Sequence, residues 1–170
     1  MDKAERIFVA ANRWALIITL AAMSVIVFAN VALRYLASYS FVWAEELARY
    51  LMIWMTFLGA GLVLRFGGHI GINSLHHILP RRLGQFLRVG LALLMIVFFA
   101  AMAWRGLDYM QVAQYQSTPA LGLPFSYVYA VFPVGFGLLI VHLLLIIRHY
   151  VLDHRFVESD EVSADVASAL

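Results

Sequence analysis

Four long stretches without a charged residue divide this chain, and they limit what it can fold into more than any other feature. They are Trp14–Leu33, Tyr50–Leu64, Val89–Trp104 and Tyr109–Ile147. About 20 apolar residues in a helix span the roughly 30 Å hydrocarbon layer of a bilayer. No stretch alternates with the two-residue period of a strand. The sequence therefore predicts an all-α integral membrane protein with four transmembrane helices.

We expect one membrane domain over residues 1–152, with spans at about 12–36, 45–66, 84–108 and 125–148. The second uncharged stretch is short, so its helix must borrow turns from its charged flanks. The first is too long for a signal peptide and lacks a clear cleavage site, so we interpret it as a retained helix. The acidic tail, residues 153–170, is predicted to be disordered.

The composition excludes several classes of function. Hydrophobic residues make up 64% of the chain and charged residues 13%, far from the balance of a soluble domain. The net charge of +2 is too small to suggest nucleic-acid binding. The absence of cysteine excludes disulfides, thiolate metal sites and a cysteine nucleophile. Thr19, Ser24 and Thr56 have no base nearby in the sequence, so we expect them to bond backbone carbonyls of their own helices, and we expect no enzyme.

The distribution of Lys and Arg predicts how the spans are oriented, because cytoplasmic loops are enriched in positive charge. Four spans place nine of these residues on one side: Lys3, Arg6, Arg13, Arg65, Arg81, Arg82, Arg88, Arg148 and Arg155. The other side holds Arg34, Arg49 and Arg105. Both termini and the loop between the second and third spans should therefore be cytoplasmic.

That loop alternates apolar with polar and basic residues, which suits a short helix lying in the headgroup plane. Asn73 would cap this interfacial helix and Pro80 would end it. The alternative is an irregular loop that contacts anionic lipid headgroups through Arg81 and Arg82.

Glu45, Glu46 and Arg49 stand in the otherwise apolar stretch FVWAEELARYLMIW. Glu45 precedes Arg65 by 20 residues, or about 30 Å of helix, so both glutamates should lie at the periplasmic boundary. A charge at the bilayer centre would cost roughly 2.5–3.5 kcal/mol and would indicate an ion path. The sequence keeps its charges away from that depth.

Three interpretations of this motif stay open. It can be the polar start of a helix, where Glu45 and Arg49 have the i,i+4 order that favours an ion pair. Arg34 could also reach either glutamate across a short hairpin. The motif can instead be a docking surface for a partner, or it can contact a substrate or ion directly. Asp108 lies at the corresponding depth of the third span, 20 residues after Arg88.

Two other classes of protein are alternatives. A haem- or quinone-binding membrane anchor of an oxidoreductase would need two intramembrane histidines to bind a haem between its helices, and only His142 lies within a span. An autonomous small oligomeric transporter would need a carboxylate deep in a helix, and no carboxylate of this chain lies at that depth. The chain also shows no internal repeat, which counts against a transporter built from inverted repeats. Gly59, Gly61, Gly135 and Gly137 permit close helix packing, either within the four-helix unit or against a partner.

Three segments carry a resemblance to a known family: WAEELARYLMIWMTFLGA, then GGHIGI, then STPALGLPFSYVYAVFPVGF. In this order, on a four-helix chain of this size, they resemble the DctQ-like small membrane subunit of tripartite ATP-independent periplasmic (TRAP) transporters. The resemblance covers roughly residues 29–147 and leaves out the acidic tail.

The resemblance implies a small, non-catalytic subunit of a secondary-active transporter in the bacterial inner membrane. Its partners would be a large membrane subunit, which holds the substrate and sodium sites, and a periplasmic binding protein that delivers a small carboxylate such as a C4-dicarboxylate or a sialic acid. This chain would hold no cofactor or metal, would bind no nucleic acid and would contact phospholipid. The expected partner-facing residues are Arg34, Glu45, Glu46, Arg49, Asp108, Pro119 and Pro124.

Overall fold

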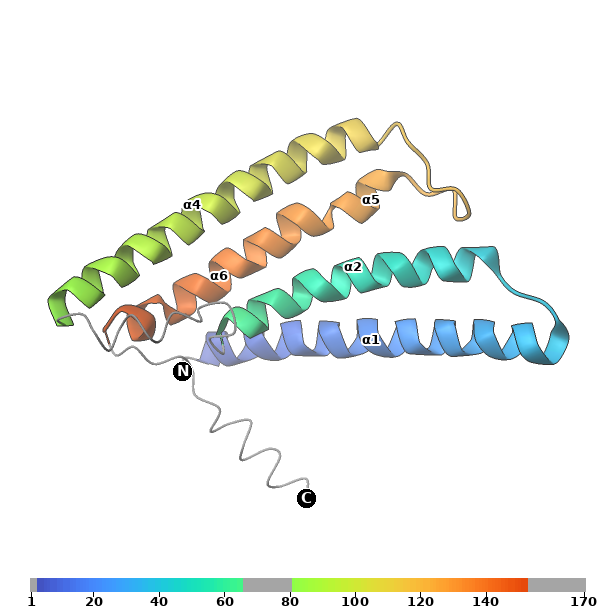
Figure 1. The fold of residues 1–170 in the computed structure, drawn as a ribbon, viewed down its shortest axis with the longest axis horizontal. Helices are drawn as coiled ribbons and strands as arrows, with labels where there is room; N and C mark the ends of the chain where they lie inside the picture. Colours follow the sequence, from blue (N-terminus) through green and yellow to red (C-terminus); the bar gives the residue numbers. More distant parts are fainter. Residues whose placement is uncertain (1–2, 66–80, 153–170) are drawn as a thin grey trace, which may run out of the picture.

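The structure is a computed structural model, and it describes residues 3–65 and 81–152. The helices are α1 (Lys3–Ala37), α2 (Val42–Arg65), α4 (Arg81–Ala113), α5 (Phe125–Tyr129) and α6 (Val131–Leu152) (Figure 1). Four helical segments are long and apolar enough to cross a membrane: Lys3–Ala37, Val42–Arg65, Leu83–Ala113 and Phe125–Ile147. The predicted all-α fold with four transmembrane helices is therefore confirmed. The predicted interfacial helix around Asn73 and the acidic tail lie outside the described residues.

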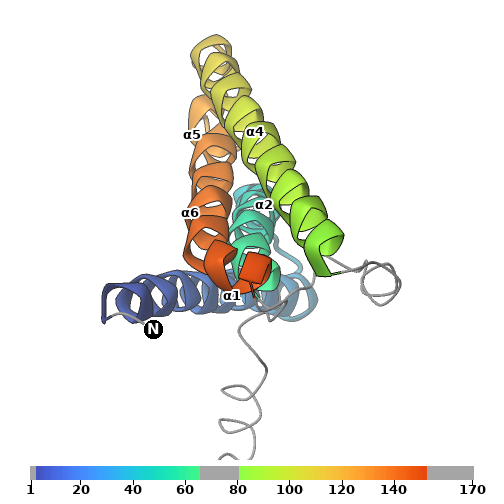
Figure 2. The ribbon, with the colours of Figure 1, turned by 90° about the vertical axis from the view of Figure 1, so that its left-hand side faces the viewer.

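The helices lie side by side in the order α1, α2, α6, α4, with α5 continuing the line of α6 (Figure 1). The chain first makes an α1–α2 hairpin, then passes to the far edge as α4, and returns between α2 and α4 as α6. Figure 2 shows that this layer is strongly twisted, because α1 runs across below while α4 and α6 rise above it. The result is an open layer with α1 and α4 at its edges.

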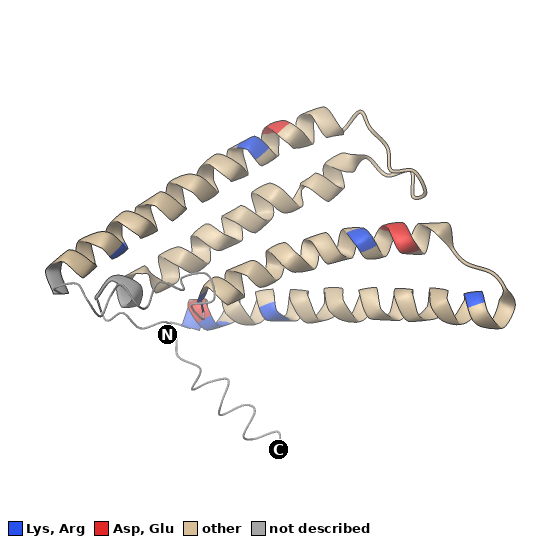
Figure 3. Ribbon diagram, viewed as in Figure 1, with Lys and Arg blue, Asp and Glu red and all other residues tan. Residues whose placement is uncertain are grey.

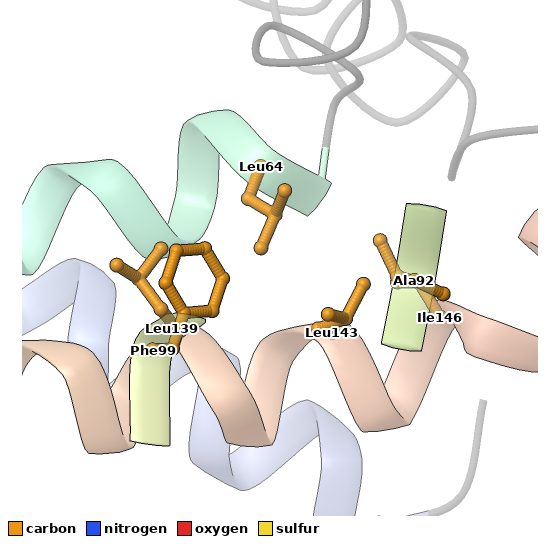
Figure 4. Packing of buried hydrophobic residues seen from close by; sticks show 6 residues of the cluster. All are labelled: Leu64, Ala92, Phe99, Leu139, Leu143 and Ile146. Carbon is orange, nitrogen blue, oxygen red and sulfur yellow. The ribbon is translucent and has the colours of Figure 1, made fainter. Parts of the chain in front are cut away.

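The buried core lies where α2, α4 and α6 meet. Its members are Leu64 from α2, Ala92 and Phe99 from α4, and Leu139, Leu143 and Ile146 from α6 (Figure 4). Aromatic rings extend this packing toward the middle of the layer, where Phe57 contacts Phe132 and Phe136 edge-to-face. Of the four spans α6 is the most buried and α1 the least.

The helix boundaries differ most from the sequence-based ones at the start of α1, at the end of α4 and within the fourth span. α1 begins nine residues before the predicted start at residue 12, and α4 continues five residues past 108. Neither extension contains Gly or Pro, so the helical backbone hydrogen bonds can continue past the bilayer boundary. The fourth span is divided at Ala130, because the ring of Pro133 excludes the carbonyl of Tyr129, four residues earlier, from a helical bond.

Candidate functional site

Charged residues lie toward the two ends of the layer, with uncharged stretches of helix between them (Figure 3). We call one end the loop end, because it holds the α1–α2 turn (residues 38–41) and the α4–α5 loop (residues 114–124). At the opposite end, the terminal end, α1 begins and α2 finishes.

Glu46 is buried at the loop end, although it stands beside the exposed Glu45 in the sequence. Its Oε2 accepts a hydrogen bond from the backbone N–H of Ala120 (2.6 Å), and its Oε1 accepts one from the Tyr50 hydroxyl (3.1 Å). The hydroxyl of Thr118 and the N–H of Leu121 lie close to the same carboxylate. Glu46 is thus an internal anchor for the α4–α5 loop rather than an exposed docking group.

The α4–α5 loop is a small hairpin that presents these donors to Glu46. The backbone N–H of Thr118 donates to the carbonyl of Leu123 (2.8 Å), and the N–H of Leu123 donates back to Thr118 Oγ1 (3.0 Å). Ser117 and Pro124 form the single antiparallel bridge that closes the hairpin. Gly122 turns the chain at φ +65°, a conformation that glycine adopts without strain.

Glu45 joins the two helices of the first hairpin. Its Oε1 lies 2.6 Å from Nη2 of Arg34, and both side chains are at least half exposed. The contact with Arg34 that the sequence allowed is therefore present, and it replaces the predicted pair with Arg49. Close by, the buried Asn30 accepts a hydrogen bond from the N–H of Phe41 (2.8 Å) and ties α1 to the start of α2.

An open groove of about 720 Å³ lies between these features. One wall is formed by three successive aromatic rings, with Tyr39 against Phe41 and Phe41 against Trp43 (centroids 5.2 and 5.4 Å apart). Tyr50 and Phe125 form a second aromatic contact on the lining, and Pro119 belongs to it as well. Arg49 and both glutamates line the same groove.

Asp108 does not join this group. It lies 3.7 Å from Arg105 on the same helix, and this pair lines a separate groove of about 570 Å³ along α4 with Tyr109 and Tyr129. The structure therefore brings together five of the seven predicted partner-facing residues: Arg34, Glu45, Glu46, Arg49 and Pro119. Pro124 occupies the N-cap position of α5, next to Phe125 of the groove lining, whereas Asp108 stands apart. The side chains of Arg81 and Arg82 are outside the described part of the structure.

A second polar cluster, which the sequence did not reveal, is buried between α1, α2 and α6 toward the terminal end. Asn12 Nδ2 donates to the carbonyl of Leu58 (3.2 Å) and lies 3.1 Å from Nε2 of the fully buried His142. Arg65, also buried, contacts Glu5 through Nη2 and Oε1 at 2.5 Å. Helix α1 is thus attached to its neighbours by polar contacts as well as by apolar packing.

The glycine next to this cluster makes room for it. A Cβ added at Gly61 would stand 2.5 Å from Cδ2 of His142, so only glycine lets the ring lie against α2. Sequence reasoning considered His142 solely as a haem ligand and overlooked Asn12. The available signal was an asparagine beside the first uncharged stretch, since a buried amide needs a partner on another helix.

Two further expectations about polar and small residues can be checked. Thr19 donates to the carbonyl of Ala15 (2.8 Å) and Thr56 to that of Met52 (2.9 Å), as predicted for hydroxyls within membrane helices. Gly61 and Gly135 serve packing inside the four-helix unit, while a Cβ at Gly137 would meet open space. Among the described residues, no three His, Cys, Asp or Glu side chains come together as a metal site.

Comparison with known proteins identifies the family of this chain. The family model described as the DctQ component of tripartite ATP-independent periplasmic transporters matches residues 23–153. The isethionate TRAP transporter permease protein DctMQ of Oleidesulfovibrio alaskensis is 33% identical over 105 residues, which cover 61% of this chain and 16% of that protein. The sialic acid TRAP transporter small permease protein SiaQ of Vibrio cholerae is 25% identical over 116 residues, 68% of this chain and 67% of its own length.

The C4-dicarboxylate TRAP transporter small permease protein DctQ of Vibrio cholerae is 39% identical over 62 residues, or 36% of this chain and 27% of that protein. The matched segments thus cover less than two thirds of DctMQ and of this DctQ. All three relatives are transport components rather than enzymes. With four membrane-spanning helices and a family match over most of its length, the chain belongs to the DctQ component family of the tripartite ATP-independent periplasmic transporters.

Proposed function

We propose that this chain is the small scaffold subunit of a secondary-active, sodium-coupled importer of a small carboxylate. It stabilises and orients a large membrane subunit that holds the substrate and sodium sites, and it carries no cofactor itself. A periplasmic binding protein delivers the substrate. The names of two relatives support the carboxylate class, since C4-dicarboxylates and sialic acid carry carboxylate groups, whereas isethionate, the substrate in the name of a third relative, is a sulfonate.

The observation that carries the scaffold role is the open layer. Because α1 packs mainly against α2 and α4 mainly against α6 and α5, both edge helices leave an apolar side uncovered that a second membrane subunit can pack against. The large exposed residues include Ile18, Val25 and Phe28 on α1 and Leu93, Leu94 and Val97 on α4. Buried charge occurs only toward the helix ends in the described part of the chain, which leaves no polar path across the layer for a substrate.

We assign the loop end to the periplasm and the terminal end to the cytoplasm, following the excess of Lys and Arg at the latter. The α4–α5 loop and the Arg34–Glu45 pair then form the surface that meets the periplasmic partners. Glu46 contributes indirectly, because it holds that loop in place through Ala120. Arg81 and Arg82 would contact phospholipid headgroups on the cytoplasmic side.

The test is an uptake assay in cells or vesicles that contain the large subunit and the binding protein, with and without this chain. We expect uptake of a radiolabelled C4-dicarboxylate or sialic acid to require all three proteins and a sodium gradient. Purification of the large subunit should recover this chain with it.

Two results would refute the proposal. Uptake by this chain alone would make it an autonomous transporter. Equal uptake by the other two proteins without this chain would remove the scaffold role. A Soret absorbance band in the purified chain would instead support the haem-binding alternative.

A further inference from the structure

Arg49 is exposed in the groove at the loop end and forms no ion pair with any described residue. The other arginine of α2, Arg65, is paired with Glu5. The two acids nearest to Arg49 are already engaged, Glu45 with Arg34 and Glu46 with Ala120 and Tyr50. The guanidinium of Arg49 therefore offers its donors to an anion from outside the chain.

The groove around this guanidinium has the composition of a membrane interface. Tyr39, Phe41 and Trp43 form one continuous aromatic wall, and Tyr50 and Phe125 contribute to the rest of the lining. Aromatic side chains of this kind are enriched at the level of lipid headgroups, where one part of the ring is apolar and another is wet.

Below Arg49 the exposed surface of α2 becomes an uncharged stripe. The remaining exposed residues of the helix are Met52, Thr56 and Val63, which fall on one face with Arg49 because they follow it by 3, 7 and 14 positions. The hydroxyl of Thr56 is satisfied by the carbonyl of Met52, so this position presents little polarity. Thr56 lies about 10 Å below Arg49, within the roughly 15 Å of one leaflet.

From these features we infer that the groove is a phospholipid site in the leaflet at the loop end. The phosphate binds the guanidinium of Arg49, the glycerol region lies between the aromatic walls, and one acyl chain follows Met52 and Thr56. A guanidinium binds a phosphate through two parallel hydrogen bonds, which fixes both position and orientation.

The charges of the site select a headgroup without net charge. Arg34 and Arg49 balance Glu45 and Glu46, so an anionic headgroup would gain one attraction and meet two carboxylates nearby. In a zwitterionic lipid such as phosphatidylethanolamine, the phosphate binds Arg49 and the amine can lie toward the exposed carboxylate of Glu45. An acidic side chain of a protein partner would use Arg49 but would leave the stripe below unexplained.

The experiment uses the full chain in nanodiscs that contain phosphatidylethanolamine with a diazirine in its acyl chain. After irradiation, peptide mass spectrometry locates the labelled residues. We expect labelling of the segment Met52–Thr56 to exceed that of the exposed residues Leu93 and Leu94, and we expect this excess to fall about tenfold in Arg49→Gln because a charge-assisted contact is lost. Arg49→Lys keeps the charge without the planar fork and should give an intermediate value.

Two positions serve as controls. Leu93 and Leu94 form an exposed apolar patch on α4, and their labelling should be the same in Arg49→Gln as in the wild type. Arg105→Gln removes another exposed arginine from the same end and should leave the labelling of Met52–Thr56 unchanged. Circular dichroism and thermal unfolding confirm that each variant is folded.

The inference fails if Arg49→Gln leaves the labelling of α2 intact, or if labelling on α4 falls by the same factor. Displacement by soluble phosphorylethanolamine at millimolar concentration would show a site for a free phosphate rather than a lipid. Equal competition by phosphatidylglycerol would overturn the selectivity for a zwitterionic headgroup. None of these outcomes depends on transport, so the inference stands or falls separately from the proposed function.

Discussion

At the scale of single residues, Glu45 and Glu46 show how strongly helix direction decides the role of a side chain. Neighbouring residues on a helix point about 100° apart, so one carboxylate faces water beside Arg34 and the other faces the α4–α5 loop. Depth is nearly the same for both. The structural consequence of removing their charge should therefore differ.

We predict that Glu46→Gln loosens the α4–α5 loop and that Glu45→Gln does not. The glutamine at 46 keeps the shape and one acceptor oxygen, but it has no charge, so its hydrogen bond from the N–H of Ala120 is weaker than the charge-assisted bond of the glutamate. Hydrogen exchange of the Ala120 amide should become several-fold faster in Glu46→Gln only. Similar exchange in both variants would mean that Glu46 does not hold the loop.

A second residue-scale prediction uses the paired glycines of α6. A Cβ at Gly135 would lie 2.8 Å from Cβ of Phe57, which cannot swing away, whereas a Cβ at Gly137 meets open space. Gly135→Ala should therefore lower the free energy of unfolding by about 1–3 kcal/mol through overpacking. Gly137→Ala should leave it unchanged or raise it by up to about 1 kcal/mol, since alanine favours the helix.

Thermal or denaturant unfolding in the same detergent measures both variants. The two substitutions add the same methyl group to the same helix, so helix propensity is matched and only the surroundings of the methyl group differ. If Gly135→Ala were as stable as Gly137→Ala, the contact between α6 and Phe57 would be looser than the structure has it.

At the scale of whole elements, α1 depends on polar contacts more than the other spans do. It is the least buried span, and it meets its neighbours through Glu5 and Asn12 toward one end and Asn30 and Arg34 toward the other. In lipid, hydrophobic residues alone do not drive helices together, because lipid tails are equally apolar. The polar contacts are therefore well placed to set the register of α1 on α2.

We predict unequal effects for the two ion pairs that join α1 to α2. Glu5→Gln leaves Arg65 buried and without its counter-ion, which typically costs about 3–5 kcal/mol. Arg34→Gln removes an exposed pair that contributes at most about 1 kcal/mol. Unfolding free energies of the two variants in detergent test this order, and equal losses would contradict it.

At the scale of the whole molecule, the twisted layer puts both hairpin connections at one end. Lys3 and Arg65 lie at the other end, which we assign to the cytoplasm. Because the chain contains no cysteine, a single introduced cysteine gives an unambiguous signal. This makes the orientation of the layer directly measurable.

We predict that Ser117→Cys, exposed in the α4–α5 loop, reacts with a membrane-impermeant maleimide once the outer membrane is made permeable. Lys3→Cys, exposed at the start of α1, should react only after the inner membrane is also opened. The physical reason is the excess of Lys and Arg at the terminal end. The reverse pattern of labelling would place the loop end in the cytoplasm and overturn the assignment.

Hydropathy predicted the number of helices and the approximate depth of the charges, because both depend on local chemistry. A helix in lipid satisfies its own backbone, so 20 apolar residues predict a span without knowledge of its neighbours. Pro133 also signalled a break locally, although its position inside the fourth span was not used. The site was less predictable, since the sequence did not show which of Glu45 and Glu46 would be buried.

The sequence by itself therefore determined four membrane-spanning helices, and it placed the Glu45–Arg49 motif near one boundary. Only the tertiary structure decided the lateral order α1, α2, α6, α4, the capture of the α4–α5 loop by Glu46, and the burial of His142 beside Asn12. The physical reason is that lipid and a neighbouring helix present similar apolar surfaces to each span. Which face meets which neighbour is then decided by shape and by a few polar groups brought together from distant parts of the chain.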